Sequence, residues 1–350
     1  MSNTSADAYM AQALIEARKG LGQTSPNPCV GAVIVHQGQI IARGYHAKAG
    51  TPHAERVAIA QAEAMGFTDW HEASIYVTLE PCSTAGRTGA CAHAIIDKGV
   101  AEVVYGAVDP NPAHEGRADA MLERAGIRCH SRVAEAECLH LIRDFRKVQE
   151  TGLPWVIIKS AMSLDGKITR PLGEGQWLSS PESRIMVHEL RSEVDAVLTG
   201  GNTVREDDPQ LNVRLPGRSA ALRQPLRIIL TRDRQSLPAA AQLLQDPATL
   251  VYETPNATSL EAALRSIVHE HGVNSVMVEA GGGLLGLFHD AGLVDEAVIF
   301  LAPLLTGGNA TAVGGAGATA LSEVLRFPKV RYQRIGDDVV VRASRSLPIV

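Results

Sequence analysis

Two successive alternations of strand and helix patterns, separated near residue 150, limit what this chain can fold into. Alternation of this kind is typical of layered α/β domains. Between the two, a helical pattern over 135–149 is followed by Gly152 and Pro154, residues that end helices. We therefore predict two α/β domains, residues 1–150 and 151–350, and a chain of 350 residues is long enough for both.

The expected elements follow from the spacing of apolar residues. In the first domain we expect helices over 10–17, 54–65 and 92–98, a hairpin over 30–35 and 40–42, and strands over 75–79 and 103–107. In the second domain we expect strands over 155–159, 196–199, 226–230 and 275–278, helices over 181–191 and 260–269, and a closing antiparallel pair over 330–335 and 339–341. The Gly-rich stretch 307–317 is expected to be a mobile loop.

Composition limits the classes of partner. Hydrophobic residues make up 45 % of the chain and charged residues 20 %, which suits ordinary globular cores and excludes disorder as the main state. The net charge is −5 and aromatic residues make up only 4 %, so the chain lacks the basic surface and stacking platforms of nucleic-acid binding. We therefore expect a small-molecule substrate and no nucleic-acid partner.

The N-terminus and the cysteines bear on location. The first ten residues lack the basic and apolar segments of a signal peptide, and no apolar run reaches the roughly 18 residues of a membrane span. The five cysteines form an odd set that ends at Cys138, which is a poor disulfide framework. We predict a cytoplasmic protein with no membrane partner, and the sequence leaves the oligomeric state open, a homo-oligomer included.

One histidine and two cysteines of the first domain have the chemistry of a zinc site. His53 opens an Ala-rich helix, Cys82 follows a buried strand and a proline, and Cys91 comes nine positions later. One imidazole and two thiolates are three zinc ligands, which leaves the fourth tetrahedral position for water, as in a catalytic site. Glu55 lies two residues beyond His53 and is expected to shuttle a proton between that water, a ring nitrogen and a leaving amine.

Each of these residues alone would more often be a buried thiol or a core histidine. Their joint placement at strand-to-helix turns favours the metal site, and helix N-termini at His53 and Cys82 would stabilise the thiolates. The remaining cysteines have no such partners and are assigned to packing: Cys29, Cys129 and Cys138.

Further motifs surround this site. They are Pro-Asn-Pro-Cys-Val-Gly-Ala-Val at 26–33, Gly-Tyr-His at 44–46, Pro-His-Ala-Glu at 52–55, Thr-Leu-Glu-Pro-Cys at 78–82 and Gly-Arg-Thr at 86–88. In these the chain resembles the deaminase half of the bifunctional deaminase/reductases of riboflavin biosynthesis. The resemblance implies a cytidine-deaminase-like three-layer α/β fold and substrate contacts at Asn27, His46 and Arg87. The chain departs from the family at Thr84 and Ala85, where histidines are usual, and at Ala90, where proline is usual.

A Gly-x-Gly-x-x-Gly pattern at 281–286 follows the expected strand 275–278 and precedes an apolar helix. Free N–H groups at such a helix start can bind a pyrophosphate. The acidic residue that a Rossmann fold places about 20 positions later is absent, and a plain Gly-rich turn would give the same pattern. The pattern alone therefore leaves both interpretations open.

The second half is similar to the reductase half of the same family, whose fold is that of the dihydrofolate reductases. The shared residues are Lys159 with Ser-Leu-Asp-Gly-Lys at 163–167, Gln-Trp at 176–177, Arg191, Thr203, Asp-Asp-Pro-Gln-Leu at 207–211, Arg214 and Glu-Ala-Gly-Gly at 279–282. The resemblance implies NADPH contacts at Ala161, Trp177, Thr203, Asp207, Thr231, Gly281, Gly282, Gly283, Leu284, Leu285, Gly286 and Leu287. It implies substrate contacts at Gly175, where the family has serine, and at Arg191, Leu211, Arg214 and Glu279.

The resemblance implies two reactions. The first domain would use zinc and Glu55 to hydrolyse the 2-amino group of 2,5-diamino-6-(5-phosphoribosylamino)pyrimidin-4(3H)-one. The second would use NADPH to reduce the ribosyl group to ribityl, giving 5-amino-6-(5-phosphoribitylamino)uracil, with Lys159 as a catalytic residue beside Glu279. Arg191 and Arg214 can hold the substrate phosphate through bidentate contacts.

Two other functions remain open from the residues. One is a nucleic-acid or nucleoside zinc deaminase with an appended nucleotide-binding domain. The other is a zinc-stabilised binding protein that senses NADPH without catalysis. For the preference for NADPH over NADH, we expect the 2′-phosphate to lie near Thr231, Arg232 and Arg234, which follow a predicted strand.

Overall fold

The computed structural model describes residues 3–83, 90–112, 116–169, 177–217, 223–254 and 256–345. The chain divides into two compact units, Met1–Thr151 and Gly152–Ile349, so the division falls one residue beyond the expected boundary. Each unit has its own sheet and its own hydrophobic core.

The first unit contains a five-stranded sheet in the order β2-β1-β3-β4-β5. Its strands are β1 Gly31–His36, β2 Gln39–Tyr45, β3 Ala73–Leu79, β4 Glu102–Ala107 and β5 Arg128–His130. Gln37 and Gly38 join β1 to β2 with φ of 49° and 76°, the positive values of a tight two-residue hairpin turn. The predicted hairpin and both predicted strands are therefore present.

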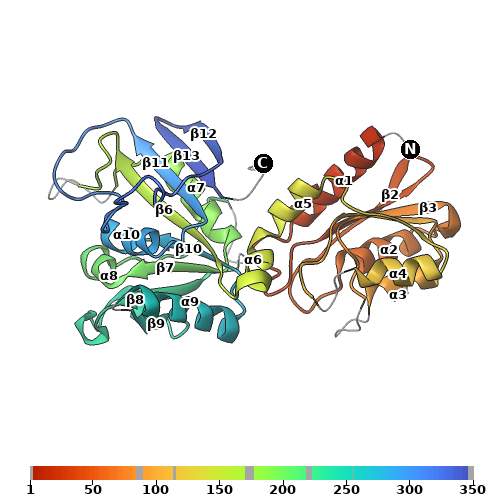
Figure 1. Ribbon diagram of the computed structural model, residues 1–350, viewed down its shortest axis with the longest axis horizontal. Helices are drawn as coiled ribbons and strands as arrows, with labels where there is room; N and C mark the ends of the chain where they lie inside the picture. The colour runs from red at the N-terminus through yellow and green to blue at the C-terminus, as the bar shows by residue number, and fades with distance from the viewer. Residues whose placement is uncertain are drawn as a thin grey trace. The chain divides into compact units, whose positions relative to one another are not determined.

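Helices cover both faces of this sheet (Figure 1). One face carries α1 Asn3–Arg18 and α5 Glu135–Leu141, and the other carries α2 Ala54–Ala64, α3 Cys91–Lys98 and α4 Arg117–Arg124. Two glycines allow helices to pack closely against the sheet. A Cβ on Gly31 of β1 would lie 2.1 Å from Ala13 O of α1, and a Cβ on Gly44 of β2 would lie 2.3 Å from Ala54 O of α2. This is the three-layer α/β arrangement expected for the first domain.

The end of the first unit differs from the expectation. The helix predicted over 135–149 is two helices, α5 and α6 Arg143–Thr151, which separate at Ile142. Cys138, Leu141 and Phe145 are buried on both sides of the break, so the hydrophobic period alone does not reveal it. Strand β5 was not predicted, because three residues are too few to show a period and its place depends on pairing with β4.

The second unit contains an eight-stranded sheet in the order β12-β13-β11-β6-β10-β7-β8-β9. Its strands are β6 Trp155–Ser163, β7 Ala196–Gly200, β8 Leu226–Thr231, β9 Leu250–Glu253, β10 Ser275–Glu279, β11 Glu296–Ala302, β12 Lys329–Ile335 and β13 Asp338–Ser344. The final hairpin, β12 and β13, is antiparallel to its neighbours, and the remaining pairs are parallel. Every strand predicted for this half is present, and β9 and β11 are additional.

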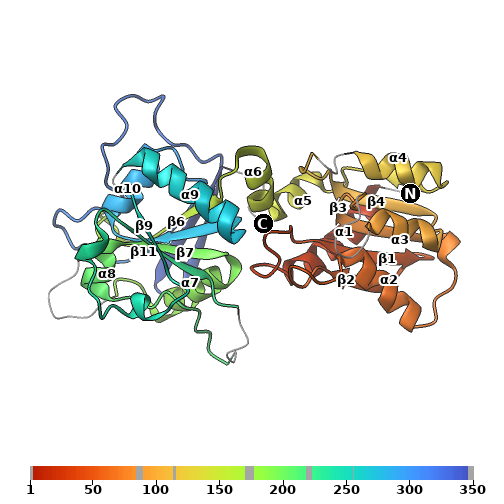
Figure 2. The ribbon, with the colours of Figure 1, turned by 90° about the horizontal axis from the view of Figure 1, so that it is seen from below.

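Two cores lie on opposite faces of this sheet. Along β6, Trp155 and Ile157 join one core while Val156 and Ile158 join the other, which is the period of a strand buried on both faces. Helices α7 Pro181–Glu193 and α8 Gly201–Asp207 cover the first core, and α9 Ala257–His271 and α10 Gly282–Asp290 cover the second (Figure 2). Short 3₁₀ turns complete the chain at Trp70–Glu72, Arg234–Ser236 and Gln242–Gln245.

The Gly-rich stretch 307–317 forms no helix or regular strand, but it is tied to the rest of the unit. Ile168 N–H donates to Ala310 O at 2.9 Å, and Ala312 N–H donates to Gly166 O at 3.0 Å. Gly314 N–H donates to Gly282 O at 2.9 Å. The stretch expected to be a mobile loop is thus hydrogen-bonded to the segment that follows β6 and to the first residue of α10.

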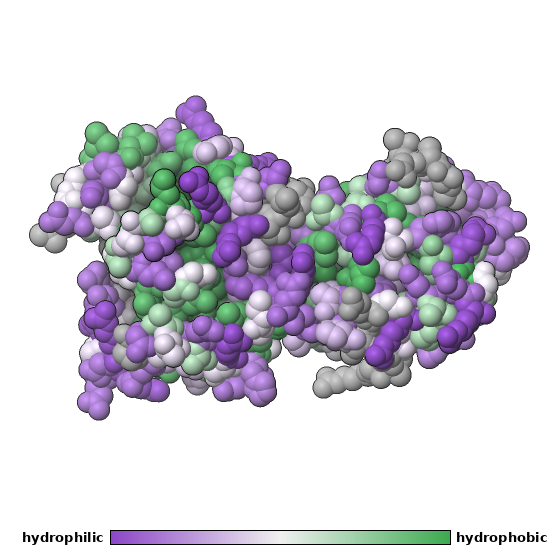
Figure 3. Space-filling model, viewed as in Figure 1, coloured by the Kyte–Doolittle hydropathy of each residue, from purple (hydrophilic) through white to green (hydrophobic). Residues whose placement is uncertain are grey.

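In the part of the chain that the structure describes, no helix is both long and apolar enough to cross a bilayer. The face drawn in Figure 3 mixes hydrophilic and hydrophobic residues over both units. This agrees with the mean hydropathy of the chain, which is +0.01.

Candidate active sites

The three predicted zinc ligands meet at one point in the first unit. His53 caps α2, Cys82 follows β3, and Cys91 is the first residue of α3. Their ligand atoms all lie within 4.8 Å of one another, and His53 Nδ1 is 3.6 Å from Cys82 Sγ and 3.4 Å from Cys91 Sγ. One imidazole and two thiols at these distances suit a tetrahedral Zn²⁺ with one position left for water.

Cys82 contacts the N-terminus of a helix that begins later in the chain. We expected a helix to start at Cys82, but α3 starts at Cys91, and the first N–H groups of α3 donate to Cys82. Cys91 N–H donates to Cys82 Sγ at 3.2 Å, and Ala92 N–H donates to Cys82 O at 3.2 Å. Contact with the Cys91 thiol is the largest effect on Cys82 and lowers the pKa of Cys82 against the opposing effect of burial, which favours the thiolate that zinc requires.

Glu55 lies in the first turn of α2 with 3 % of its surface exposed. Burial, followed by the nearby Cys82 sulfur, raises the pKa of Glu55 to about 7. A carboxyl group that titrates near neutral pH can both accept and return a proton. Glu55 therefore has the position and the acidity of a proton shuttle.

His46 orients Asn27 beside this cluster. His46 Nδ1 is 3.2 Å from Pro52 O, which can only accept, so the ring hydrogen lies on Nδ1 and Nε2 accepts from Asn27 Nδ2 at 3.3 Å. Only 2 % of His46 is exposed, and burial lowers its pKa. Of the three expected substrate contacts of the first domain, two therefore hold each other: Asn27 is hydrogen-bonded to His46, whose ring nitrogens are both engaged.

Glu80, which the sequence analysis did not single out, ties a turn to this site. Its carboxylate accepts from the N–H groups of Asp109, Gly116 and Ala118 at 3.3, 3.1 and 3.2 Å. Glu80 is 3 % exposed and lies two residues before Cys82. The signal that could have identified Glu80 is its position, an acidic residue between a buried strand and a proposed metal ligand.

Several predicted residues lie outside the described residues: Thr84, Ala85, Arg87 and Gly175. Ala90, the third departure from the deaminase pattern, is described and caps α3 with φ of −64°. Proline prefers this angle, so alanine follows the same backbone path.

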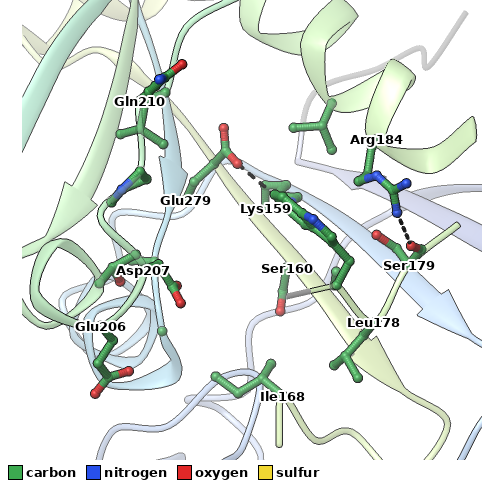
Figure 4. A pocket seen from close by; sticks show the side chains of 18 of the residues that line it. Lys159, Ser160, Ile168, Leu178, Ser179, Arg184, Glu206, Asp207, Gln210 and Glu279 are labelled. Carbon is green, nitrogen blue, oxygen red and sulfur yellow. Dashed lines mark hydrogen bonds and ion pairs between the residues drawn. The ribbon is translucent and has the colours of Figure 1, made fainter. Parts of the chain in front are cut away.

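The second unit has a cleft of about 820 Å³ at the carboxyl ends of β6, β7 and β10 (Figure 4). In open α/β sheets this edge is where ligands bind. The structure brings ten of the predicted residues to its lining: Lys159, Ala161, Trp177, Arg191, Thr203, Asp207, Leu211, Arg214, Glu279 and Gly281.

Glu279 is the anion at the centre of this cleft. It pairs in register with Lys159 on the neighbouring strand, and Lys159 Nζ lies 3.6 Å from its carboxylate (Figure 4). Arg191 adds a two-point contact, Nε to Oε1 at 2.6 Å and Nη2 to Oε2 at 3.1 Å. Burial opposes ionisation, but Arg191 and then Lys159 outweigh it and lower the pKa of Glu279 to about 2. Burial also lowers the pKa of Lys159.

This pairing changes the role expected for Arg191. Its Nη1 donates to Asn212 O at 2.9 Å, so all three guanidinium nitrogens have protein partners. The structure shows a two-point contact of Arg191 with Glu279, and the contact expected with a substrate phosphate stays a prediction. Arg214 is exposed in the cleft and donates to Gln210 Oε1 at 2.7 Å, which leaves it as the more accessible cation.

The glycine motif contributes less lining than expected. Helix α10 begins at Gly282 with Gly281 as its cap, and Gly281 alone of 281–287 lines the cleft. A Cβ on Gly282 would lie 2.1 Å from Thr311 O, and one on Gly286 2.3 Å from Gly315 N, so these glycines allow close packing of the Gly-rich stretch. Leu285 is fully buried in the core. Gly283, Leu284 and Leu287 complete the motif without lining the cleft.

Thr231 ends β8 outside the lining, with its hydroxyl donating to Asp233 O at 2.9 Å. The lining residues that were missed include two on helix α7, Arg184 and His188. They lie on α7 seven and three positions before Arg191, the spacing of one helix face. That spacing was the signal that could have identified them.

Two family models cover most of the chain. Residues 3–107 match the cytidine and deoxycytidylate deaminase zinc-binding region, and residues 154–341 match the RibD C-terminal domain. Each match lies within one unit of the structure.

Full-length relatives carry both parts in the same order. The riboflavin biosynthesis protein RibD of Aquifex aeolicus is 38 % identical over 96 % of this chain and 98 % of its own length. RibD of Escherichia coli is 37 % identical over 95 % of this chain and 97 % of its own. Such coverage does not fit a nucleic-acid or nucleoside deaminase with an unrelated appended domain, nor a protein that only binds.

Solved structures agree. Acinetobacter baumannii RibD, form 1, superposes with a TM-score of 0.89 at 35 % identity, covering 98 % of this chain and 99 % of that one. A diaminohydroxyphosphoribosylaminopyrimidine deaminase/5-amino-6-(5-phosphoribosylamino)uracil reductase from Thermotoga maritima has a TM-score of 0.86 at 31 % identity, with 98 % and 99 % covered. The zinc-type cluster, His53 with Cys82 and Cys91, lies in one unit, and the charged cleft lies in the other. Together with these likenesses, this shows that the chain belongs to the RibD family and is a bifunctional deaminase/reductase of riboflavin biosynthesis.

Proposed function

We propose that the first unit hydrolyses the 2-amino group of 2,5-diamino-6-(5-phosphoribosylamino)pyrimidin-4(3H)-one. The observation that carries this is the cluster of His53, Cys82 and Cys91 within 4.8 Å, with Glu55 buried beside it. These three side chains would hold one Zn²⁺, which lowers the pKa of water enough to make hydroxide available near neutral pH. Glu55 takes one proton from the attacking water and delivers it to a ring nitrogen. It then takes the second proton from the hydroxyl that has been added at C2 and delivers it to the amine, which leaves as ammonia when the C–N bond breaks. Asn27, oriented by His46, contacts the pyrimidine.

In the same proposal, the second unit reduces the ribosyl group of the deaminated product to ribityl. NADPH supplies the hydride for such a reduction, and the protein binds and orients the reactants. Lys159 lies beside Glu279 in the cleft, and its lowered pKa suits the delivery of a proton to the nitrogen on C1′ of an opened sugar. Glu279 holds that ammonium in place, and Arg214 offers its guanidinium to the substrate phosphate.

Removal of the metal should separate the two activities. We expect chelation to stop ammonia release from the diaminopyrimidine and to leave NADPH oxidation on preformed deaminated intermediate unchanged, because the zinc-type cluster and the cleft belong to different units. The measurement follows ammonia and NADPH absorbance on the full chain, before and after dialysis against chelator and again after added Zn²⁺. Loss of both reactions would argue against independent sites.

The preference for NADPH over NADH should depend on cations at the end of β8. Arg232 and Arg234 are exposed there, and Arg205 Nη1 donates to Ser236 Oγ at 2.8 Å, which brings a third cation to the same turn. We expect R232A/R234A to lower the NADPH-to-NADH ratio of kcat/KM by about tenfold or more, the effect of losing a charged hydrogen bond to the 2′-phosphate.

The control for that double variant is R331A/R334A on β12. It also removes two positive charges, but from a strand at the opposite edge of the sheet from β8. It should leave the cofactor ratio unchanged. A wild-type ratio in R232A/R234A would remove Arg232 and Arg234 as determinants of the preference.

We also propose a cytoplasmic location and a small-molecule substrate with no nucleic-acid or membrane partner. All five cysteines are thiols rather than disulfides, which suits a reducing compartment. A monomer and a homo-oligomer are both compatible with this proposal.

A further inference from the structure

His188 lies on the face of α7 that lines the cleft. Arg184, His188 and Arg191 all line the cleft from this face. Arg191 is held by Glu279 and Asn212, whereas the imidazole of His188 packs against the backbone of 212–214. The contacts of that ring decide what it can offer to a ligand.

One nitrogen of His188 has two backbone neighbours that make opposite demands. Nδ1 is 3.1 Å from Asn212 O, which needs a donor, and 3.2 Å from Arg214 N, whose N–H needs an acceptor. Asn212 O already accepts from Arg191 Nη1 at 2.9 Å. A hydrogen on Nδ1 would oppose the Arg214 N–H, so the favourable state has Nδ1 as the acceptor. In the neutral ring the hydrogen then lies on Nε2.

The ring is neutral at physiological pH. Burial and the positive charges of Arg191 and Arg214 lower the pKa of His188, and they outweigh the opposing effects of Asn212 O and Glu279. A neutral ring with Nδ1 as acceptor is a donor at Nε2 only.

That donor is available to a ligand. Among the residues that the structure describes, Nε2 has no hydrogen-bond partner, and His188 lines the cleft together with the exposed Arg214. A neutral N–H donor beside a guanidinium suits an anionic oxygen, because the guanidinium supplies charge and the imidazole supplies direction.

We propose that His188 is a substrate-binding residue of the reductase cleft, whose Nε2–H donates to a phosphate oxygen of the phosphoribosyl substrate beside Arg214. This inference rests on the proposed function. The same chemistry would suit a phosphate of the dinucleotide cofactor, so the experiment separates the two sources.

The test uses two variants of the full chain, which separate the role of Nδ1 as acceptor from the proposed role of Nε2–H as donor. In H188N the side-chain oxygen can still accept from Arg214 N–H, but nothing replaces Nε2–H. In H188Q the longer amide can place an N–H near the position of Nε2. The reaction is followed by NADPH oxidation with 5-amino-6-(5-phosphoribosylamino)uracil and, separately, with its dephosphorylated counterpart.

For H188N we expect KM for the phosphorylated substrate to rise about tenfold, the effect of one hydrogen bond to a charged group, with kcat nearly unchanged. KM for NADPH and the kinetics of the dephosphorylated substrate should stay at wild-type values, and H188Q should recover part of the loss. A merely structural role would change both substrates alike.

Three results would overturn the assignment: equal changes for phosphorylated and dephosphorylated substrates, a rise confined to KM for NADPH, or wild-type KM values in H188N. The second would assign the donor to a cofactor phosphate. If the wild-type chain reduces neither uracil, the proposed function itself fails, which is distinct from a failure of His188 alone.

Discussion

The variant E55Q is expected to lose ammonia release by a factor on the order of 10²–10⁴ while it retains bound zinc and its fold. Glutamine keeps the size and the hydrogen-bonding capacity of the side chain but cannot carry the proton between water, ring and amine. Zinc should remain because its proposed ligands, His53, Cys82 and Cys91, are untouched. The measurements are ammonia release, zinc content per chain, and NADPH oxidation on deaminated substrate, which should stay at the wild-type rate.

The matched control is E63Q on the same helix. Glu63 lies near the end of α2 and pairs with Lys98 at the surface, so its loss should change activity little and stability by about 1 kcal/mol or less. If ammonia release survives in E55Q with zinc still bound, Glu55 is not the shuttle. If E55Q loses zinc as well, Glu55 contributes to the metal site itself.

The second large effect is expected from E279Q. Removal of this carboxylate leaves Arg191 and Lys159 buried without their anion, which typically costs about 3–5 kcal/mol of unfolding free energy. Reductase activity should be lost, since Lys159 is no longer held in the cleft, while ammonia release in the first unit persists. Urea unfolding in a W70F background reports on the second unit, because the remaining tryptophans are Trp155 and Trp177.

The pH dependence of this effect has a definite sign. The pKa of Glu279 is about 2 in the folded chain and 4.5 without its partners, so the folded state favours the ionised form. The stability from this group is fully present above about pH 4.5 and is lost as the pH falls toward 2. The gap in stability between wild type and E279Q should therefore narrow as the pH falls from about 4.5 toward 2.

The control for E279Q is E261Q. Glu261 and Arg265 form a pair on α9 at 2.8 Å with both side chains about half exposed, and such pairs contribute about 0.3–0.5 kcal/mol. E261Q should unfold like the wild type at every pH. A gap between wild type and E279Q that does not change with pH would show that Glu279 stabilises the fold through packing rather than charge.

Local patterns predicted most of the elements, because the side-chain period of a helix or strand is a property of consecutive residues. Helix α2 was expected over 54–65 and occupies Ala54–Ala64, and β10 was expected over 275–278 and occupies Ser275–Glu279. Predictions were poorer where an element depends on a distant partner. The four residues of β9 show little period, and the strand forms by pairing with β8.

The candidate sites divide in the same way. The proposed zinc ligands could be predicted because few residue types bind zinc and three of them stand near strand-to-helix turns, and the structure brings these three side chains together. Their geometry was not readable, since α3 begins at Cys91 and reaches Cys82 through space. In the reductase cleft, His188 was missed because its spacing of three residues from Arg191 indicates only a shared helix face, and the cleft that this face lines is built from residues distant in the chain.

The sequence by itself determined the two α/β units, the zinc-type residues of the first, and the set of charged residues available to the second. Only the tertiary structure decided how those charges are used. Arg191 and Glu279 lie 88 residues apart in the chain, and their side chains meet because α7 packs against the sheet near the end of β10. That contact makes Arg191, which the sequence offers only as a cation for the substrate, the partner of a buried carboxylate. The physical reason is that hydrogen bonds and ion pairs depend on distance and direction in space, whereas a sequence records only separation along the chain.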